Sequence, residues 1–404
     1  PEQQYIFEGK PNNGTILVNV TDVGGPGSTP SVSKTDYLLG NPYPSALDIH
    51  KFIDDNVGVI DGTLNLWQQW SGSSHNLSQY NGGYAQVNKL GSVRAYQFVG
   101  LEGAHNGSQD GITTPSRYLP VGQGFMAEII ADGTVEFNND QRIFIKEADA
   151  DGTYNNGSAF FRSAATTTSA TEEENIFQKI RLELNSVNGP ATRRELLLGF
   201  SDATTDAYDY GYEALNTESG ANDLNLALDG DNYTMQAYSP ITEDKEIPLN
   251  FKSSGDYFYE IKITETENVP EDQDIYIRDT YTESTFKLSD LEAYEFSATA
   301  GEFNDRFQIV FRESVTLSVV DQEIEALNYY YSNTRDKLVV MNPKGVEIKS
   351  IQIFNILGQS VYNNQNLHQQ SYNEYPITDL STGTYVVNMN TESGVLNKKI
   401  IINN

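Results

Sequence analysis

Carboxylates are the most abundant acidic or basic groups in this sequence, since its 404 residues include 56 Asp and Glu against 26 Lys and Arg and four His. Two carboxylates about 5 to 9.5 Å apart across a cleft can hydrolyse a glycosidic bond, and alternating Asp residues around a Gly turn can bind Ca²⁺. The second pattern occurs at Asp149 and Asp151, before Gly152, and more loosely at Asp206 and Asp209. The first of these lacks the glutamate that closes a calcium loop. We interpret both as acidic turns and keep structural calcium as the alternative.

The residues that other catalytic sites need are absent or scattered. The chain has no cysteine, and its four histidines, His50, His75, His105 and His368, lie far apart without the H-E-x-x-H spacing of a zinc site. The sequence contains neither a G-x-S-x-G nucleophile turn nor a phosphate-binding G-x-x-x-x-G-K-[ST] loop. We therefore predict no catalytic residue, no cofactor and no metal site, and expect that these residues are not an enzyme.

Two tryptophans, Trp67 and Trp70, raise the possibility of sugar binding, because an exposed aromatic face can stack on a sugar ring. Their odd spacing places them on opposite faces of one strand, so that one ring could be buried and the other exposed. Packing of both rings in the core or at a sheet edge is the simpler interpretation. A glycan ligand remains the alternative.

The net charge of −30 excludes whole classes of partner. Nucleic acids and anionic lipids are bound through basic surfaces, so we expect neither. No apolar run approaches the roughly 18 residues that span a bilayer. Because the sequence opens on Pro1 rather than on a methionine or a signal peptide, we expect it to be a processed or truncated piece.

The elements that would carry these side chains are predicted to be strands. The 25 Tyr, 18 Phe and 32 Gly favour strands and tight turns over helices. In "YEIKIT", Ile261 and Ile263 alternate with Lys262, which is typical of a half-buried antiparallel sheet. We predict an all-β protein of tandem antiparallel β-sandwich domains.

Composition divides the chain into three predicted modules. The stretch "SAATTTSATEEEN" has no apolar periodicity and indicates a linker at 163–175, and a weaker break occurs at 314–328. The modules are then a β-rich region at 1–162, a β-sandwich at 176–313 and a small domain at 329–404. From residue 331 onward there are six basic and five acidic residues, a net of +1, so that −31 remains upstream.

One short helix is predicted near residues 45–55 of the first module. Ser45 can cap it, Asp48 completes a capping box, and Ala46, Ile49 and Ile53 share a face. The stretches "YLLGNPYPSALD", "GTLNLW", "PVGQGF" and "FNNDQR" resemble a segment of large secreted flavobacterial proteins. No activity is implied by that resemblance.

The last module reads as consecutive strands, in which Tyr385 and Val387 share one face. We expect Gly358 and Gly383 in turns that reverse the chain, and Gly394 in the last hairpin. The stretches "IFNILGQSVY", "DLSTGTYVV" and "KKIII" resemble, in this order, the type A C-terminal sorting domain of the Bacteroidota type IX secretion system. The resemblance implies an Ig-like fold and a sorting signal that includes Gly358, Gln359, Gly383, Tyr385, Gly394, Lys398, Lys399 and Ile400.

The resemblance also implies partners and a location. Such domains are read by the outer-membrane translocon and its shuttle protein, and are usually removed by a surface peptidase, so we expect export to the cell surface or the medium. For the upstream modules two functions stay open. They are adhesive or stalk-like domains with an unknown surface or glycan ligand, or accessory domains of a polysaccharide-active enzyme whose catalytic part lies upstream.

Overall fold

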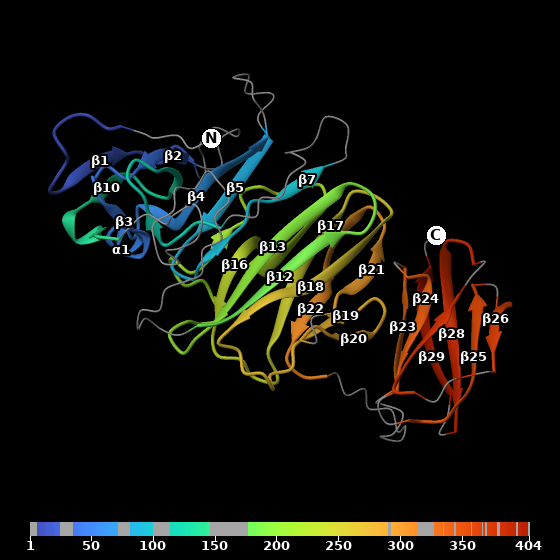
Figure 1. The fold of residues 1–404 in the computed structure, drawn as a ribbon. Helices are drawn as coiled ribbons and strands as arrows, with labels where there is room; N and C mark the ends of the chain where they lie inside the picture. Colours follow the sequence, from blue (N-terminus) through green and yellow to red (C-terminus); the bar gives the residue numbers. More distant parts are fainter. Residues whose placement is uncertain are drawn as a thin grey trace. The chain divides into compact units, whose positions relative to one another are not determined.

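A computed structural model gives the fold of the chain (Figure 1). It describes residues 6–24, 35–71, 81–99, 114–145, 177–289, 292–313, 327–333, 335–342, 345–356, 358–365, 367, 370–377, 380–392 and 395–402. These residues are nearly all in strands, which confirms the predicted all-β class; the described helices are α1 (Ile49–Asp55) and a 3-10 turn, η2 (Asn139–Gln141). Neither is long and apolar enough to cross a membrane, and the search covered the described part of the chain.

The chain forms two compact units. The large unit comprises residues 1–280, 285–294 and 298–312, and the C-terminal unit comprises residues 281–284, 295–297 and 313–404. The two predicted linkers, 163–175 and all but the last two residues of 314–328, lie outside the described residues.

Three sheets build the amino-terminal part of the large unit. The first pairs β1 (Ile16–Val20) with β10 (Gly133–Phe137), and the second has the order β11 (Arg142–Ile143), β3 (Ala46–Asp48) and β8 (Tyr118–Leu119). The third has five strands in the order β2 (Thr35–Gly40), β9 (Gly124–Ile129), β4 (Ile60–Ser71), β5 (Asn81–Val87) and β6 (Ser92–Val93). All of their pairings are antiparallel.

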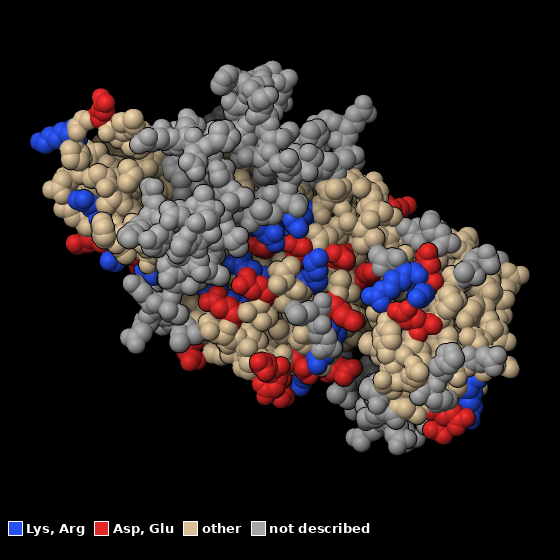
Figure 2. All heavy atoms as spheres, viewed as in Figure 1, with Lys and Arg blue, Asp and Glu red and all other residues tan. Residues whose placement is uncertain are grey.

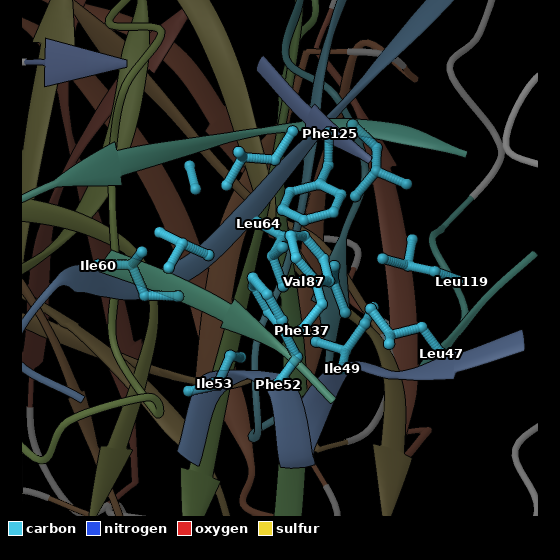
Figure 3. Close-up of a cluster of buried hydrophobic side chains, with 14 of the residues drawn as sticks. Leu47, Ile49, Phe52, Ile53, Ile60, Leu64, Val87, Leu119, Phe125 and Phe137 are labelled. Carbon is cyan, nitrogen blue, oxygen red and sulfur yellow. The ribbon is translucent and has the colours of Figure 1, made fainter. Parts of the chain in front are cut away.

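Helix α1 closes the core of this part (Figure 3). Its Phe52 ring stacks on Phe137 at 5.0 Å between centroids and meets the edge of Phe125 at 5.5 Å. Ile49 and Ile53 of the same helix are fully buried. Aromatic pairs of this kind stabilise a core by about 0.5 to 1.5 kcal/mol beyond the area they bury. The short helix predicted for this region is therefore present, and its apolar face packs into the core.

The helix begins later than the sequence predicted. Ala46 and Asp48 belong to β3, which pairs on both sides, and the N-cap is Asp48, whose carboxylate accepts from the backbone N–H of His50 at 3.1 Å. The capping box expected at Ser45 is thus wrong. Sheet pairing outweighs a cap because it satisfies several backbone groups at once.

The rest of the large unit is one sheet of twelve strands. Ten strands follow one path in the order β20 (Ser284–Lys287), β19 (Tyr276–Asp279), β22 (Gly301–Val310), β17 (Glu246–Ser253), β15 (Asp223–Leu228), β16 (Asp231–Tyr238), β13 (Ala191–Phe200), β12 (Gln178–Ser186), β18 (Tyr257–Glu267) and β21 (Tyr294–Ala298). β14 (Ala214–Leu215) pairs with β16, and β7 (Gln97–Val99) pairs with β13. β13 and β16 run parallel, an exception to the antiparallel pairing predicted from sequence.

The two halves of this sheet face each other as a sandwich. Phe251 of β17 meets Tyr259 of β18 at 5.0 Å between ring centroids, and Tyr294 of β21 meets Phe307 of β22 at 6.4 Å. Ile261 and Ile263 are buried as predicted, and Lys262 on the opposite face contacts the carboxylates of Glu183 and Glu260. The alternation in "YEIKIT" therefore predicted correctly which residues lie on each face of β18.

Strand pairing and hydrogen bonds join the amino-terminal part to the twelve-stranded sheet. β7 pairs with β13, and Thr63 of β4 donates to the Glu213 carbonyl at 3.1 Å. Gln86 of β5 donates to the Leu215 carbonyl at 2.9 Å. The modules expected at 1–162 and 176–313 therefore lie in one compact unit and do not separate in the structure.

The C-terminal unit is a small sandwich. One sheet has the order β23 (Asn328–Ser332), β24 (Lys337–Met341) and β27 (Tyr372–Pro376), and the other has the order β26 (Ser360–Asn364), β25 (Ile348–Asn355), β28 (Gly383–Thr391) and β29 (Val395–Ile402). Side chains of both sheets form one core, which includes Leu338, Val340, Ile351, Ile353 and Val387. Its strands correspond to the segments predicted from the sequence.

Candidate sorting site

The predicted sorting residues that the structure describes lie on the four-stranded sheet of the C-terminal unit or in the turn between β25 and β26. In the antiparallel pairing of β28 with β29, Tyr385 lies opposite Ile400, and both side chains are buried in the core. β28 lies between β25 and β29, whereas β29 pairs with β28 alone among the described strands. β29 is therefore an edge strand, and the side chains of its buried face anchor it to the core.

The side chain of Tyr385 fixes the conformation of the stretch "DLSTGTY". Its hydroxyl donates to the carbonyl of Ser381, four residues upstream, at 2.7 Å. A Cβ at Gly383 would lie 3.6 Å from the Tyr385 ring, which is an ordinary contact. The tyrosine thus fixes the path by which the chain enters β28, as the tyrosine corner does in Ig-like sandwiches.

Gly383 does not lie where the sequence placed it. It is the first residue of β28, pairs with Ile402, and is not among the residues with positive φ. The prediction of a chain reversal at Gly383 is therefore wrong; the pattern of Gly before a strand reads equally well as the beginning of that strand. Gly394 lies outside the described residues.

Gly358 does lie in a turn, the hairpin between β25 and β26. Its φ is +77°, and its backbone N–H donates to the Asn355 carbonyl at 2.9 Å. Gln359 closes the same turn, because its backbone N–H donates to the Asn355 side chain at 3.0 Å. Nothing lies within 4 Å of a Cβ built on Gly358, so glycine is needed here for its backbone conformation and not for space.

The adjacent lysines point to opposite faces of β29. Lys399 is exposed, whereas Lys398 is partly buried beside β23, where its Nζ lies 3.4 Å from the Asn328 side-chain oxygen and 5.8 Å from the centroid of the Tyr329 ring. Burial lowers the pKa of Lys398 to about 8. The Tyr329 hydroxyl is buried without a hydrogen-bond partner. Only one of the two lysines is therefore free to meet a partner.

Lys398 gives a pH-dependent prediction. Its folded pKa of about 8 lies below the ordinary 10.5, so the unfolded chain binds more protons between these values and stability rises with pH across this window. We expect Lys398→Met to raise the unfolding midpoint of the C-terminal unit at pH 7, and the gain over the parent to shrink from pH 8 to 10.5. Thermal unfolding at pH 7, 9 and 10.5 measures this. A gain independent of pH would contradict it, and Lys399→Met, at an exposed site, is the matched control.

The acidic turn at Asp206 and Asp209 is used within the fold. Asp206 accepts from the Lys245 side chain and from the backbone N–H of Ser239, while Asp209 accepts from the backbone N–H of Thr205. Burial opposes ionisation of Asp206, but the hydrogen bonds from Lys245 and Ser239 lower its pKa. In the part of the chain that the structure describes, no three His, Cys, Asp or Glu residues are placed to hold a metal ion. Asp149 and Asp151 lie outside that part.

The same turn ends on a carboxyl that the sequence did not single out, Glu213. It is 2% exposed, and it accepts from the backbone N–H groups of Asp209 at 2.8 Å and Ala237 at 3.3 Å. Burial raises its pKa to about 8 despite these hydrogen bonds. Nothing in "TDAYDYGYE" distinguishes Glu213 from Asp206 and Asp209, because its environment includes the backbone of Ala237, which lies 24 residues further along the chain.

Several buried carboxylates of the twelve-stranded sheet contact arginines. On the face of the molecule shown in Figure 2, Lys and Arg side chains likewise lie among Asp and Glu side chains. Arg94 donates to Glu183 at 2.8 Å and to Glu195 at 2.7 Å. Two buried pairs, Arg194 with Asp223 and Arg306 with Asp279, are each joined by two or more hydrogen bonds. These groups explain where part of the charge is neutralised, and sequence spacing alone could not pair them.

The structure describes the side chain of one of the two tryptophans. Trp67 is 38% exposed, meets the Tyr84 ring edge-on at 5.1 Å, and lies over Gly82, where a Cβ would come within 2.6 Å of the indole. The side chain of Trp70 lies outside the described residues. His50, the described histidine of the four, lies in α1.

Two protein-family models match the chain. A domain of unknown function, DUF8693, matches residues 2–311, and the secretion system C-terminal sorting domain matches residues 331–403. No curated protein matches. Among solved structures, a biofilm-associated protein, its BSP domain, aligns at 11% identity and a TM-score of 0.21; the alignment covers 96% of this chain and 63% of that chain.

The matched sorting domain coincides with the small sandwich and with the stretches that resembled it in sequence. The chain is thus a cargo of the type IX secretion system, interacts with that machinery, and is exported across the outer membrane to the cell surface or the extracellular space. The first model covers more than half of the chain, including nearly all of the large unit. The chain therefore belongs to the DUF8693 family, and its large unit is joined to a C-terminal sorting domain.

Proposed function

We propose that the C-terminal unit is the export address of a cell-surface protein from a member of the Bacteroidota. The outer-membrane translocon and its shuttle protein read this unit, and a surface peptidase then removes it. The observation that carries the proposal is the sorting-domain match at residues 331–403, on a unit that has a core of its own. A domain with its own core can be recognised and removed without unfolding its neighbour.

For the large unit we propose an adhesive or stalk-like role rather than catalysis. Four of its buried carboxylates, Glu183, Glu195, Asp223 and Asp279, each contact an arginine, which favours a structural use of their charge. The exposed ring of Trp67 supports a glycan as one class of ligand, since aromatic faces stack on sugars. Fold alone assigns no function, so the role rests on these side chains.

A fusion tests the export address. We expect residues 327–404, joined to an unrelated soluble protein that is already delivered to the periplasm, to carry that protein across the outer membrane of a type IX competent host. The matched control ends at residue 382 and so lacks β28 and β29. Immunoblots of periplasm, cell surface and medium measure the distribution. Retention of the longer fusion in the periplasm, with its C-terminal unit folded, would contradict the proposal.

A further inference from the structure

Some apolar side chains of the sorting-domain stretches face away from the core. Ile353, Tyr385 and Val387 are buried in the core of the C-terminal unit, so their strand neighbours Phe354 and Val386 point to the opposite face of the sheet. Ile401 likewise alternates with the buried Ile400 and Ile402. Core packing explains one half of each stretch and leaves the other half unexplained.

Strand register brings these outward side chains together. Phe354 of β25 lies opposite Val386 of β28, and Val386 lies opposite Lys399 of β29. On the fourth strand, β26, Ser360 is the partner of Phe354, and a bulge leaves Val361 between Ser360 and Tyr362. Because Tyr362 packs against the core, Val361 faces outward on the side of Phe354. We name these four residues, Val361, Phe354, Val386 and Lys399, the outer row; each strand of the sheet β26-β25-β28-β29 contributes one of them.

Three of the four outer-row residues are exposed, and Phe354 is half-buried. Val361 is 37% and Val386 38% exposed, Lys399 is exposed, and Ile401 next to Lys399 is half-buried. The neighbouring row of the same face is polar instead, with the Asn388 side chain donating to Asn397 at 2.9 Å. Contiguous exposed apolar side chains that are rimmed by polar residues mark interaction surfaces.

We infer that the outer row is the surface by which the type IX machinery recognises this domain, and that its partner is a protein that presents apolar side chains and a carboxylate opposite Lys399. This inference rests on the export role proposed above. Lys399 fixes the charge of the partner, because an exposed lysine at the end of an apolar row is complemented by an acid.

Substitutions on this face of the full chain test the inference. We expect Val361→Thr with Val386→Thr, and separately Lys399→Glu, to reduce the exported amount about tenfold, the change that corresponds to about 1.4 kcal/mol of binding. Threonine keeps the β-branched shape, so the unfolding midpoint of the C-terminal unit should not change. Val395→Thr is the matched control, since Val395 is 54% exposed on the same face of β29 but at its other end, and Lys349→Glu controls for charge.

The outcomes separate the inference from the export role. If removal of residues 383–404 stops export while the outer-row variants are exported like the parent chain, the surface is wrong and the export role stands. Equal losses in Val395→Thr and in the outer-row variants would also overturn the surface. Export that survives the removal would overturn both. If the valine variant unfolds, Lys399→Glu alone decides, because an exposed lysine is not needed for the fold.

Discussion

A chain shortened by residues 383–404 should stay folded in its large unit and should not leave the cell. The deletion removes β28 and β29, and with them Tyr385, Val387 and Ile400 from the core of the small sandwich, so the C-terminal unit cannot form. The large unit has a separate core and should keep its unfolding midpoint. Export should fall from most of the protein to none detectable.

The measurement needs two readings on one culture. Fractionation gives the distribution of the shortened chain among periplasm, surface and medium. Fluorescence of Trp67 and Trp70, both of which belong to the large unit, gives its unfolding midpoint after purification from the periplasm. A folded chain confined to the periplasm is the expected result. Export equal to that of the parent would refute the role of the C-terminal unit.

Replacing Asp223 by alanine should destabilise the large unit by about 3 to 5 kcal/mol, because it leaves the charge of Arg194 buried without its partner. Asp223 is fully buried and binds Arg194 through both carboxylate oxygens, at 2.7 and 3.0 Å. Its carboxylate also accepts from Asn216 and from the backbone N–H of Gly220, both at 3.0 Å. Since domains are stable by about 5 to 15 kcal/mol, this is a large share.

Urea unfolding of the full chain, followed by tryptophan fluorescence, measures the loss. Asp244→Ala is the matched control: Asp244 pairs with Arg312 at 2.8 Å, but both side chains are more than half exposed, and such pairs contribute about 0 to 1 kcal/mol. Replacing both Arg194 and Asp223 by apolar residues should recover part of the stability. An Asp223→Ala loss no larger than that of Asp244→Ala would contradict the account.

The sequence predicted the strands better than their ends. Alternation of apolar and polar residues located β18 and β28, because a strand that is half buried must alternate. A capping-box signal misplaced the start of α1, since Ala46 and Asp48 pair with strands that lie far along the chain. A local capping signal carries no information about strands that are distant in sequence.

The candidate site was predictable in part for a similar reason. The closing stretches located β28 and β29, and their alternation could have placed Lys398 and Lys399 on opposite faces. It could not show that Lys398 lies against β23, which depends on how the two sheets pack. Gly383 was misplaced because a glycine before a strand is compatible with a turn and with a strand beginning. The sequence did not predict that the first two modules form one compact unit. A low-complexity stretch such as 163–175 suggests a domain boundary whether or not the strands on either side of it pair.

The parallel pair of β13 and β16 makes the assembly of the large unit a late and non-local event. Leu197 can meet Met235 only after the chain between them has crossed over, and β13 must also accept β7, which lies far earlier in the sequence. Closing such a long loop lowers the chain entropy before the stabilising contacts form, and this slows folding. Because β22 contributes residues up to Val310 to the same sheet, the sandwich closes only once nearly the whole large unit has been synthesised. A partly made chain would therefore leave unpaired strand edges for chaperones to shield.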